Sequence, residues 1–247
     1  GTGMPTSGIY RSTNYGASWS DLSRRDSVST GGLPDSIRSV YFILTGPTDP
    51  DTVVFAGTLD NGVFRNRGGR AAWLPASSGL PTGPAARLRG MLRNPADGNV
   101  LYAGVAARGI YKSLDGGGTW TKKRVAASDT TDIQTLAQAP SSPTFLYGGT
   151  FSEAMFRSTV GAEIWDPLPS LPAGLSARAI AVHPLQPARI YSGTFNGVYQ
   201  SSAAGVAQVT YGVGGGPTTV ISANLDTSAL ADLAVSNGTD NTVTILL

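Results

Sequence analysis

The amino-acid sequence predicts an all-β fold, a β-propeller built from four-stranded blades. Two observations lead to this prediction. An apolar pair that precedes a turn recurs at intervals of 43 to 54 residues, with its aromatic members at Tyr10, Phe64, Tyr111, Phe156 and Tyr199. Each interval also holds three further short β-rich segments, separated by turn-forming residues. Four short strands in ~45 residues are the repeating unit of a propeller blade.

The strands can be placed in chain order. Two strands are expected at the N-terminus, around Ile9-Tyr10 and Trp19, and four complete units follow. In these units the first strand leads into a proline, at Pro47, Pro95, Pro140 and Pro184. The second strands are TVVFAGTLD (52–60), NVLYAGVAA (99–107), TFLYGGTFS (144–152) and ARIYSGTFN (188–196). Three more strands are expected in the tail, within residues 218–225, 232–238 and 242–247.

Composition fits one domain over residues 1–247 and limits the possible functions. The 32 glycines and 16 prolines suit many short strands joined by turns. The net charge is only +2, and no basic stripe is interleaved with aromatic residues, which argues against a nucleic-acid partner. No apolar run approaches the length that spans a bilayer, so no membrane span is expected.

Cysteine usage limits the chemistry of the protein, and lysine usage indicates its location. The absence of cysteine excludes disulfides, thiolate metal sites and a cysteine nucleophile, and it fits a cytosolic protein as well as an exported bacterial one. Lysine is rare, whereas serine, threonine, glycine and alanine are abundant, as in exported bacterial surface proteins. The sequence therefore predicts an extracellular or cell-surface location.

The turn Ser113–Trp120, SLDGGGTW, and its near copy Ser12–Trp19, STNYGASW, resemble the Asp-box, or BNR, repeat with its pattern Ser-x-Asp-x-Gly-x-Thr-Trp. Partial copies are NRGGRAAW (66–73), STVGAEIW (158–165) and the segment from Ser201, which lacks the tryptophan. The resemblance covers residues 1–210. It implies a hairpin between the third and fourth strands of a blade, with a structural Asp115 and a tryptophan buried between sheets. Such repeats occur in sialidases, xyloglucan-degrading enzymes, sortilin-type receptors and photosystem assembly propellers.

Residues 211–247 resemble a different propeller repeat, the FG-GAP or VCBS repeat, which carries a calcium loop followed by Leu-Ala-Val. The matching positions are Asn224, Asp226, Ser228 and Asp232, followed by Leu233, Ala234 and Val235. Oxygen-bearing side chains at alternate positions suit Ca²⁺, but Ala229 replaces the loop glycine. The alternative interpretation is a plain polar hairpin without metal; no other cofactor is expected.

The strand count has a consequence for ring closure. The expected strands exceed by one the number that five four-stranded blades need. We therefore expect five blades, with a closing blade composed of strands from both termini and one surplus edge strand. Such an edge offers a route to a homo-oligomer, because an unpaired strand can pair with another chain. The alternative is that the chain is a piece of a larger ring of six or seven blades.

Loops between the second and third strands of the blades are expected to share one face and to form a binding site. Candidate residues there are Asp60, Arg108, Phe151, Glu153 and Phe195. Aromatic rings suit stacking on sugars, but Phe151 and Phe195 also suit packing between blades. A catalytic site is not expected, since the single histidine, His183, adjoins Pro184 at a strand end, and no distinctive pair of carboxylates is found.

These observations favour a non-catalytic exported propeller that acts as a structural module or binds a glycan or protein surface. Two alternatives stay open. One is a glycoside hydrolase related to the Asp-box enzymes, for which Asp60 is the best single candidate residue. The other is a self-assembling extracellular matrix or filament subunit that uses the surplus edge strand.

Overall fold

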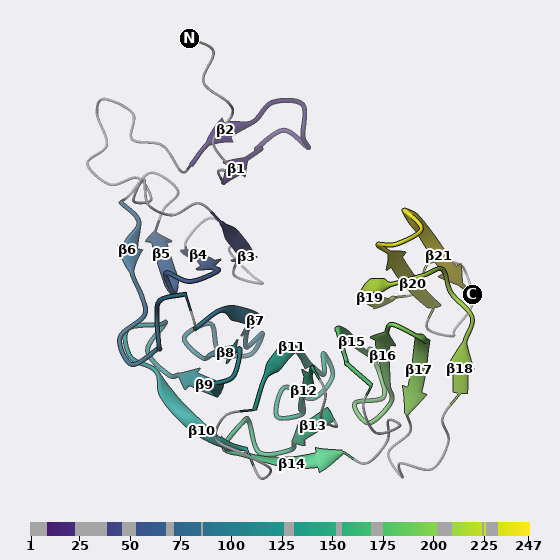
Figure 1. Ribbon diagram of the computed structural model, residues 1–247. Helices are drawn as coiled ribbons and strands as arrows, with labels where there is room; N and C mark the ends of the chain where they lie inside the picture. The colour runs from purple at the N-terminus through teal and green to yellow at the C-terminus, as the bar shows by residue number, and fades with distance from the viewer. Residues whose placement is uncertain are drawn as a thin grey trace.

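The computed structural model is an all-β molecule in which small antiparallel sheets follow one another around a centre (Figure 1). It describes residues 9–22, 39–45, 53–67, 72–84, 86–125, 131–151, 155–168, 175–201, 209–223, 225 and 232–247. None of these residues is helical. The predicted all-β propeller is confirmed.

The strands group into a hairpin, four blades and a final sheet. The N-terminal hairpin comprises β1 (Tyr10–Arg11) and β2 (Ser20–Asp21). Blade I comprises β3 (Val40–Leu44), β4 (Val53–Thr58), β5 (Val63–Arg67) and β6 (Leu74–Pro75). Blade II comprises β7 (Leu88–Arg93), β8 (Leu101–Val105), β9 (Gly109–Ser113) and β10 (Thr121–Val125).

Blade III comprises β11 (Ile133–Gln138), β12 (Leu146–Thr150), β13 (Met155–Ser158) and β14 (Ile164–Leu168). Blade IV comprises β15 (Ala179–Val182), β16 (Ile190–Thr194), β17 (Gly197–Ser201) and β18 (Val209–Tyr211). The C-terminal sheet comprises β19 (Pro217–Ala223), β20 (Asp232–Asn237) and β21 (Thr242–Leu246). These strands lie in the segments where the sequence predicts them.

Within each blade, successive strands pair antiparallel from the centre of the molecule outward. Strands β3, β7, β11, β15 and β19 lie nearest the centre (Figure 1). The outermost strands of blades II and III also pair with each other, β10 running parallel to β14 with Val125 opposite Trp165. This pairing joins the two blades into one eight-stranded sheet.

Buried apolar side chains form separate clusters between consecutive blades. The second strand of each complete blade contributes an aromatic ring to the cluster shared with the next sheet, namely Phe55, Tyr102, Tyr147 and Tyr191. All four are at most 4% exposed. Each blade is therefore held mainly by its two neighbours.

Three of the four tryptophans, each at the third turn of a blade, lie between neighbouring sheets as the sequence predicts. Trp73, Trp120 and Trp165 are 5%, 5% and 0% exposed. The Trp120 indole Nε1–H donates to the Ala76 carbonyl of blade I at 2.8 Å, and Trp73 Nε1–H donates to the Leu22 carbonyl of the N-terminal hairpin at 2.8 Å. In both cases the acceptor directly follows the outermost strand of the preceding sheet.

The expectation is wrong for Trp19, which is 63% exposed. Its turn is formed correctly, with the Ser18 N–H donating to Asn14 Oδ1 at 2.8 Å. However, Trp19 belongs to the first sheet of the arc, so no described sheet precedes it to cover the ring. A turn motif fixes the local backbone, whereas burial of the ring needs a neighbouring blade.

The two ends of the chain do not share a sheet among the described residues. Strands β1 and β2 pair only with each other, and β19, β20 and β21 form a sheet of their own. A gap separates these two ends, so that the sheets form an open arc (Figure 1). The composite closing blade expected from the strand count is therefore not seen.

Candidate binding site

Backbone hydrogen bonds place equivalent residues of successive blades at one end of the inner strands. The N–H groups of Leu59, Ala106 and Phe151, which directly follow β4, β8 and β12, donate to carbonyls that lie just before the inner strands of the same blades. These carbonyls belong to Ser39, Arg87 and Asp132, at 3.0, 2.9 and 3.2 Å. Arg178 holds the corresponding place in blade IV, where its N–H donates to the Gly193 carbonyl at 3.0 Å. We call this set, with the loops between the second and third strands, the loop rim.

Local chemistry keeps the loops of the rim short. At the end of β4, Thr58 Oγ1 donates to the Gly62 carbonyl at 2.7 Å and accepts the Asn61 N–H at 3.1 Å. Thr194 repeats this at the end of β16 with Gly197 and Asn196, at 3.0 and 3.1 Å. Gly62 and Gly197 have φ values of +74° and +120°, which a side chain would strain. The loops are therefore held at defined places beside the inner strands.

The rim exposes two phenylalanines at equivalent positions of blades III and IV. Phe151 is 54% exposed and Phe195 is 55% exposed. The Arg178 guanidinium lies over the Phe195 ring, with Cζ 3.9 Å from the ring centroid, a cation–π contact. Of the two roles that the sequence left open for these rings, exposure on the rim fits the structure better than packing between blades.

Of the polar candidates, Asp60 is hydrogen-bonded within its turn, whereas the side chain of Arg108 is exposed. Asp60 Oδ1 accepts the Asn61 side-chain amide at 2.9 Å, and the Asp60 carbonyl accepts the Gly83 N–H at 2.7 Å. Arg108 is exposed and closes a turn by donating its N–H to the Val105 carbonyl at 3.1 Å. Glu153 lies outside the described residues. The structure thus brings Asp60, Arg108, Phe151 and Phe195 to one rim, and their roles in binding stay predictions.

Sequence reasoning missed a second set of side chains, which are presented by β-bulges on the inner strands. The pairing of each inner strand with the second strand of its sheet is interrupted by one extra residue. These extra residues are the second residues of β3, β7, β11 and β19, namely Tyr41, Arg89, Gln134 and Thr218. A bulge redirects the side chain of its extra residue. No linear pattern marks these four positions, because a bulge becomes apparent only once the partner strand is known.

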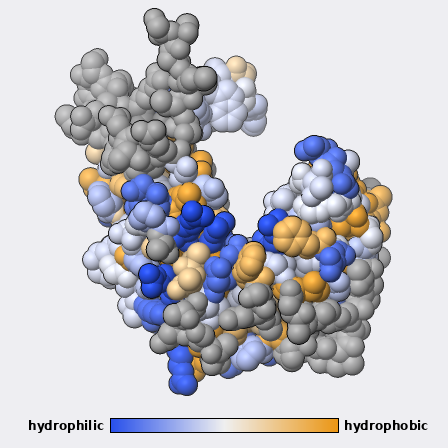
Figure 2. Space-filling view, in the orientation of Figure 1, coloured by the Kyte–Doolittle hydropathy of each residue, from blue (hydrophilic) through white to orange (hydrophobic). Residues whose placement is uncertain are grey.

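The inner strands and the loop rim together carry several arginines. Arg87, Arg108 and Arg178 are exposed, and Arg89 Nε is buried without a hydrogen-bond partner among the described residues. The carboxylate of Asp132 accepts the Gln134 side-chain amide at 3.1 Å. Figure 2 shows hydrophilic and hydrophobic surfaces side by side along the inner edge of the arc. A rim of this composition can stack on flat groups and donate hydrogen bonds to oxygen atoms.

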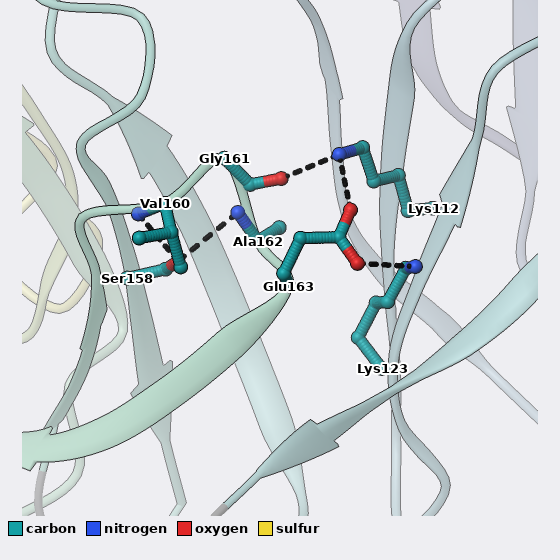
Figure 3. A network of polar contacts seen from close by, with 7 residues as sticks. All are labelled: Lys112, Lys123, Ser158, Val160, Gly161, Ala162 and Glu163. Atoms are coloured by element: carbon teal, nitrogen blue, oxygen red, sulfur yellow. Dashed lines mark hydrogen bonds and ion pairs between the residues drawn. The ribbon is translucent and has the colours of Figure 1, made fainter.

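A second polar network lies away from the rim, where a turn of blade III meets blade II (Figure 3). Glu163 accepts from Lys112 Nζ at 2.6 Å and from Lys123 Nζ at 2.8 Å, and Lys112 also donates to the Gly161 carbonyl at 2.7 Å. The two lysines, Lys112 first, lower the pKa of Glu163. This carboxylate is therefore ionised at neutral pH and unsuited to act as an acid catalyst.

The same contact recurs one blade earlier, which identifies it as a structural clamp. Arg65 Nη1 of blade I donates at 2.9 Å to the carbonyl of Gly116 in the turn of blade II. Gly116 and Gly161 hold the same place in their turns, both with φ of +65°. In each case the basic residue that follows the aromatic residue of the third strand, Phe64 or Tyr111, holds the turn of the next blade.

His183, the single histidine of the sequence, lies in an ordered strand end. His183 is 6% exposed, its Nδ1 accepts the Leu185 N–H at 3.2 Å, and burial lowers its pKa. This is the capped strand end that the sequence predicts. Among the described residues, no group of three or more histidines, aspartates and glutamates is close enough to hold a metal ion. Their backbone also contains no helix that could cross a membrane.

The calcium hypothesis rests mainly on residues outside the described ones, namely Asn224, Asp226 and Ser228. Asp232 begins β20 and is 1% exposed, and its Oδ2 accepts the Leu225 N–H at 2.6 Å. One carboxylate oxygen of Asp232, a proposed calcium ligand, is thus already hydrogen-bonded to the backbone at Leu225. Calcium binding stays a prediction.

Comparisons with known proteins agree on the fold. No protein-family model matches the chain, and no curated protein shows significant sequence similarity to it. A GH74 enzyme from Niastella koreensis aligns with 96% of the chain at 19% identity and a TM-score of 0.72. The GH74 xyloglucanase from Xanthomonas campestris aligns with 98% at 16% identity and a TM-score of 0.65.

A third similar structure is that of YCF48 bound to a D1 peptide, which aligns with 85% of the chain at 13% identity and a TM-score of 0.57. The alignments cover 40% and 42% of the two GH74 proteins and 64% of YCF48. The chain therefore spans less than half the length of these GH74 enzymes. At such identities the similarity shows the fold alone, a β-propeller.

Proposed function

We propose that this propeller is a non-catalytic binding module that holds a glycan on the loop rim through Phe151 and Phe195. The observation that carries the proposal is the repetition of an exposed phenylalanine at one position in two neighbouring blades. A single exposed apolar side chain is ordinary on a protein surface, but the same aromatic residue exposed at one position of two neighbouring blades offers a repeated surface for stacking. Both phenylalanines directly follow a strand, β12 or β16, so their own backbone is already held in place when a ligand binds.

The chemistry of the rim suits sugars. The apolar face of a pyranose ring stacks on an aromatic ring, while its hydroxyl groups accept hydrogen bonds. The Arg178 guanidinium, which lies over one face of the Phe195 ring, offers donors next to the exposed part of that ring. One similar fold is that of a xyloglucanase, an enzyme that acts on a glycan. The rarity of lysine and the Asp-box-like turns support the further expectation of an exported protein of the Asp-box class.

Binding of soluble polysaccharides tests the proposal. A panel of xyloglucan, galactan and polygalacturonate is titrated into the wild-type protein by isothermal calorimetry, beside a peptide panel of equal concentration. We expect binding to a polysaccharide and a loss of at least about tenfold in affinity, or about 1.4 kcal/mol, for Phe151→Ala/Phe195→Ala.

Leu185→Ala provides the matched control. Leu185 is also an exposed apolar residue, at 76%, but it lies in the loop between β15 and β16, at the other end of the strands. Its removal should leave affinity unchanged. Equal losses in both variants, or binding to peptides alone, would contradict the proposal.

A glycoside hydrolase is the second candidate, favoured by the similarity to GH74 enzymes over almost the whole chain. Asp60 is the residue to test, although its carboxylate is engaged by the Asn61 amide. Release of reducing ends from xyloglucan that stops in Asp60→Asn would establish this function. Binding of xyloglucan without release of reducing ends would instead favour the non-catalytic binding module.

A further inference from the structure

Strand β21 occupies the place of a third strand but has no fourth strand beside it in the described part of the chain. In blades I to IV the third strands β5, β9, β13 and β17 each pair with a fourth. β21 pairs with β20 alone and forms the edge of the C-terminal sheet. Figure 1 places it at the outer margin of the arc, close to the C-terminus. Its outer row of backbone groups has no strand partner among the described residues.

The edge carries none of the features that usually prevent association. Its residues, Thr242–Leu246 (TVTIL), include no charge and no proline, and its pairing with β20 has no bulge. Val243 and Ile245 are 65% and 48% exposed. The residues that correspond to Val243 in the complete blades are at most 1% exposed: Val63, Ile110, Met155 and Val198.

The order of residues in β21 is self-complementary for antiparallel pairing. With Thr244 at a twofold axis, Thr244 lies opposite its own copy, and Val243 of each chain lies opposite Ile245 of the other. β-Branched cross-strand pairs and Thr–Thr pairs are favourable in antiparallel sheets. We propose that two copies of the chain dimerise through antiparallel pairing of their β21 strands in this register.

The dimer extends an apolar row that the sheet already presents. Ile221, Ala234 and Ile245 lie opposite one another across β19, β20 and β21. Val243 of the second copy continues this row beyond Ile245, in a sheet with three strands from each copy. The β10–β14 contact shows that blade edges of this protein do accept a further strand. Because a twofold interface uses both edges, assembly stops at the dimer and does not continue into a filament.

The mass in solution tests whether the edge is responsible. Sedimentation velocity over a concentration series should show the wild type as a dimer that dissociates on dilution. Val243→Lys/Ile245→Lys places charges on the edge and should give a monomer, with circular dichroism confirming the fold. Ile221→Lys is the matched control, since Ile221 is 51% exposed on the same face but on β19, away from the edge. It should remain dimeric.

A single introduced cysteine tests the register, because the natural chain contains none. Thr244→Cys places two thiols opposite each other and should form a disulfide-linked dimer under mild oxidation. Thr242→Cys should not, since its counterpart lies four residues away in register, about 13 Å at ~3.3 Å per residue. This separation exceeds the ~4.4–6.8 Å between Cα atoms that a disulfide spans.

Three results would overturn the inference: a wild type that is monomeric at every concentration, dissociation by Ile221→Lys as well, or equal cross-linking of the two cysteine variants. The first would leave the edge unused. The second would assign association to the face of the sheet, and the third would exclude the proposed register.

Discussion

Asp115 shows how one side chain organises a turn. Its Oδ1 accepts the Thr119 N–H and the Ser113 hydroxyl, each at 2.8 Å, and its Oδ2 accepts the Thr119 hydroxyl at 2.8 Å. These bonds, led by the Thr119 N–H, lower the pKa of Asp115 from 3.8 to about 2. In the turn Ser12–Trp19, Asn14 takes the same place, accepting the Ser18 N–H at 2.8 Å and donating to the Ser18 hydroxyl at 2.9 Å.

We expect Asp115→Ala to lower the free energy of unfolding by about 1 kcal/mol, because three hydrogen bonds disappear at a solvent-exposed turn. Asp115→Asn should lose less, as Asn14 demonstrates. Ionised Asp115 contributes stability above its unfolded pKa of 3.8, and this contribution is lost as the pH falls through about 2. Urea unfolding at pH 7 and between pH 4 and 2 measures both effects. A constant difference between wild type and Asp115→Asn over the acid range would contradict the assignment.

At the scale of strands and turns, the tryptophans show that turn formation depends on local sequence, whereas burial of the ring depends on a neighbouring sheet. Trp19 and Trp120 end nearly identical turns, yet one is 63% exposed and the other 5%. The Ser-x-Asp/Asn pattern predicts the turn because its hydrogen bonds join residues at most four positions apart. Burial depends on the sheet that precedes the turn, which the motif does not contain.

Trp120→Ala should therefore destabilise the protein by about 3–5 kcal/mol, through the lost ring and the lost bond to Ala76. Trp19→Ala is expected to change stability by less than about 0.5 kcal/mol, since the ring is already in solvent. Both values come from chemical denaturation followed by far-UV circular dichroism. Similar losses in the two variants would mean that Trp19 is covered in solution.

The same distinction explains which site features the sequence could predict. Phe151, Phe195, Asp60 and Arg108 were found because turn residues mark the loops between second and third strands. The Arg178–Phe195 contact was not found, since its partners are 17 residues apart and meet only when the loop folds beside β15. The bulges at Arg89 and Gln134 likewise depend on pairing between strands.

For the whole molecule, stability is distributed along the arc. The clusters join each sheet only to its neighbours, so the terminal sheets have fewer supporting contacts than the blades between them. The repeat length and the strand order predicted this architecture correctly. The strand count favours a closed ring and offers a piece of a larger ring only as the alternative, because counting strands says nothing about the curvature that the packed sheets adopt.

Native-state hydrogen exchange should follow this distribution. Amides of β1 and β2 are expected to exchange fastest and those of β8 and β12 slowest, because local opening is easiest where few apolar contacts hold a strand. Mass spectrometry of peptides after timed deuterium labelling measures the gradient. Uniform protection from β1 to β12 would instead indicate that the whole arc opens as a single unit.

The parallel pairing of β10 with β14 also determines where the arc can bend. Paired strands make blades II and III one continuous sheet, and thus one segment of the arc. Among the described residues, blades I and II, and blades III and IV, are joined through their backbones only by individual bonds outside the named strand pairs, such as those from the Leu88 N–H to the Leu59 carbonyl and from the Ala177 N–H to the Thr150 carbonyl. Hinge motion that widens or narrows the gap should accordingly be concentrated at the junctions flanking this segment. Phe195 lies beyond one such junction and Phe151 lies within the segment, so bending there would adjust the spacing between the two rings to the length of a ligand.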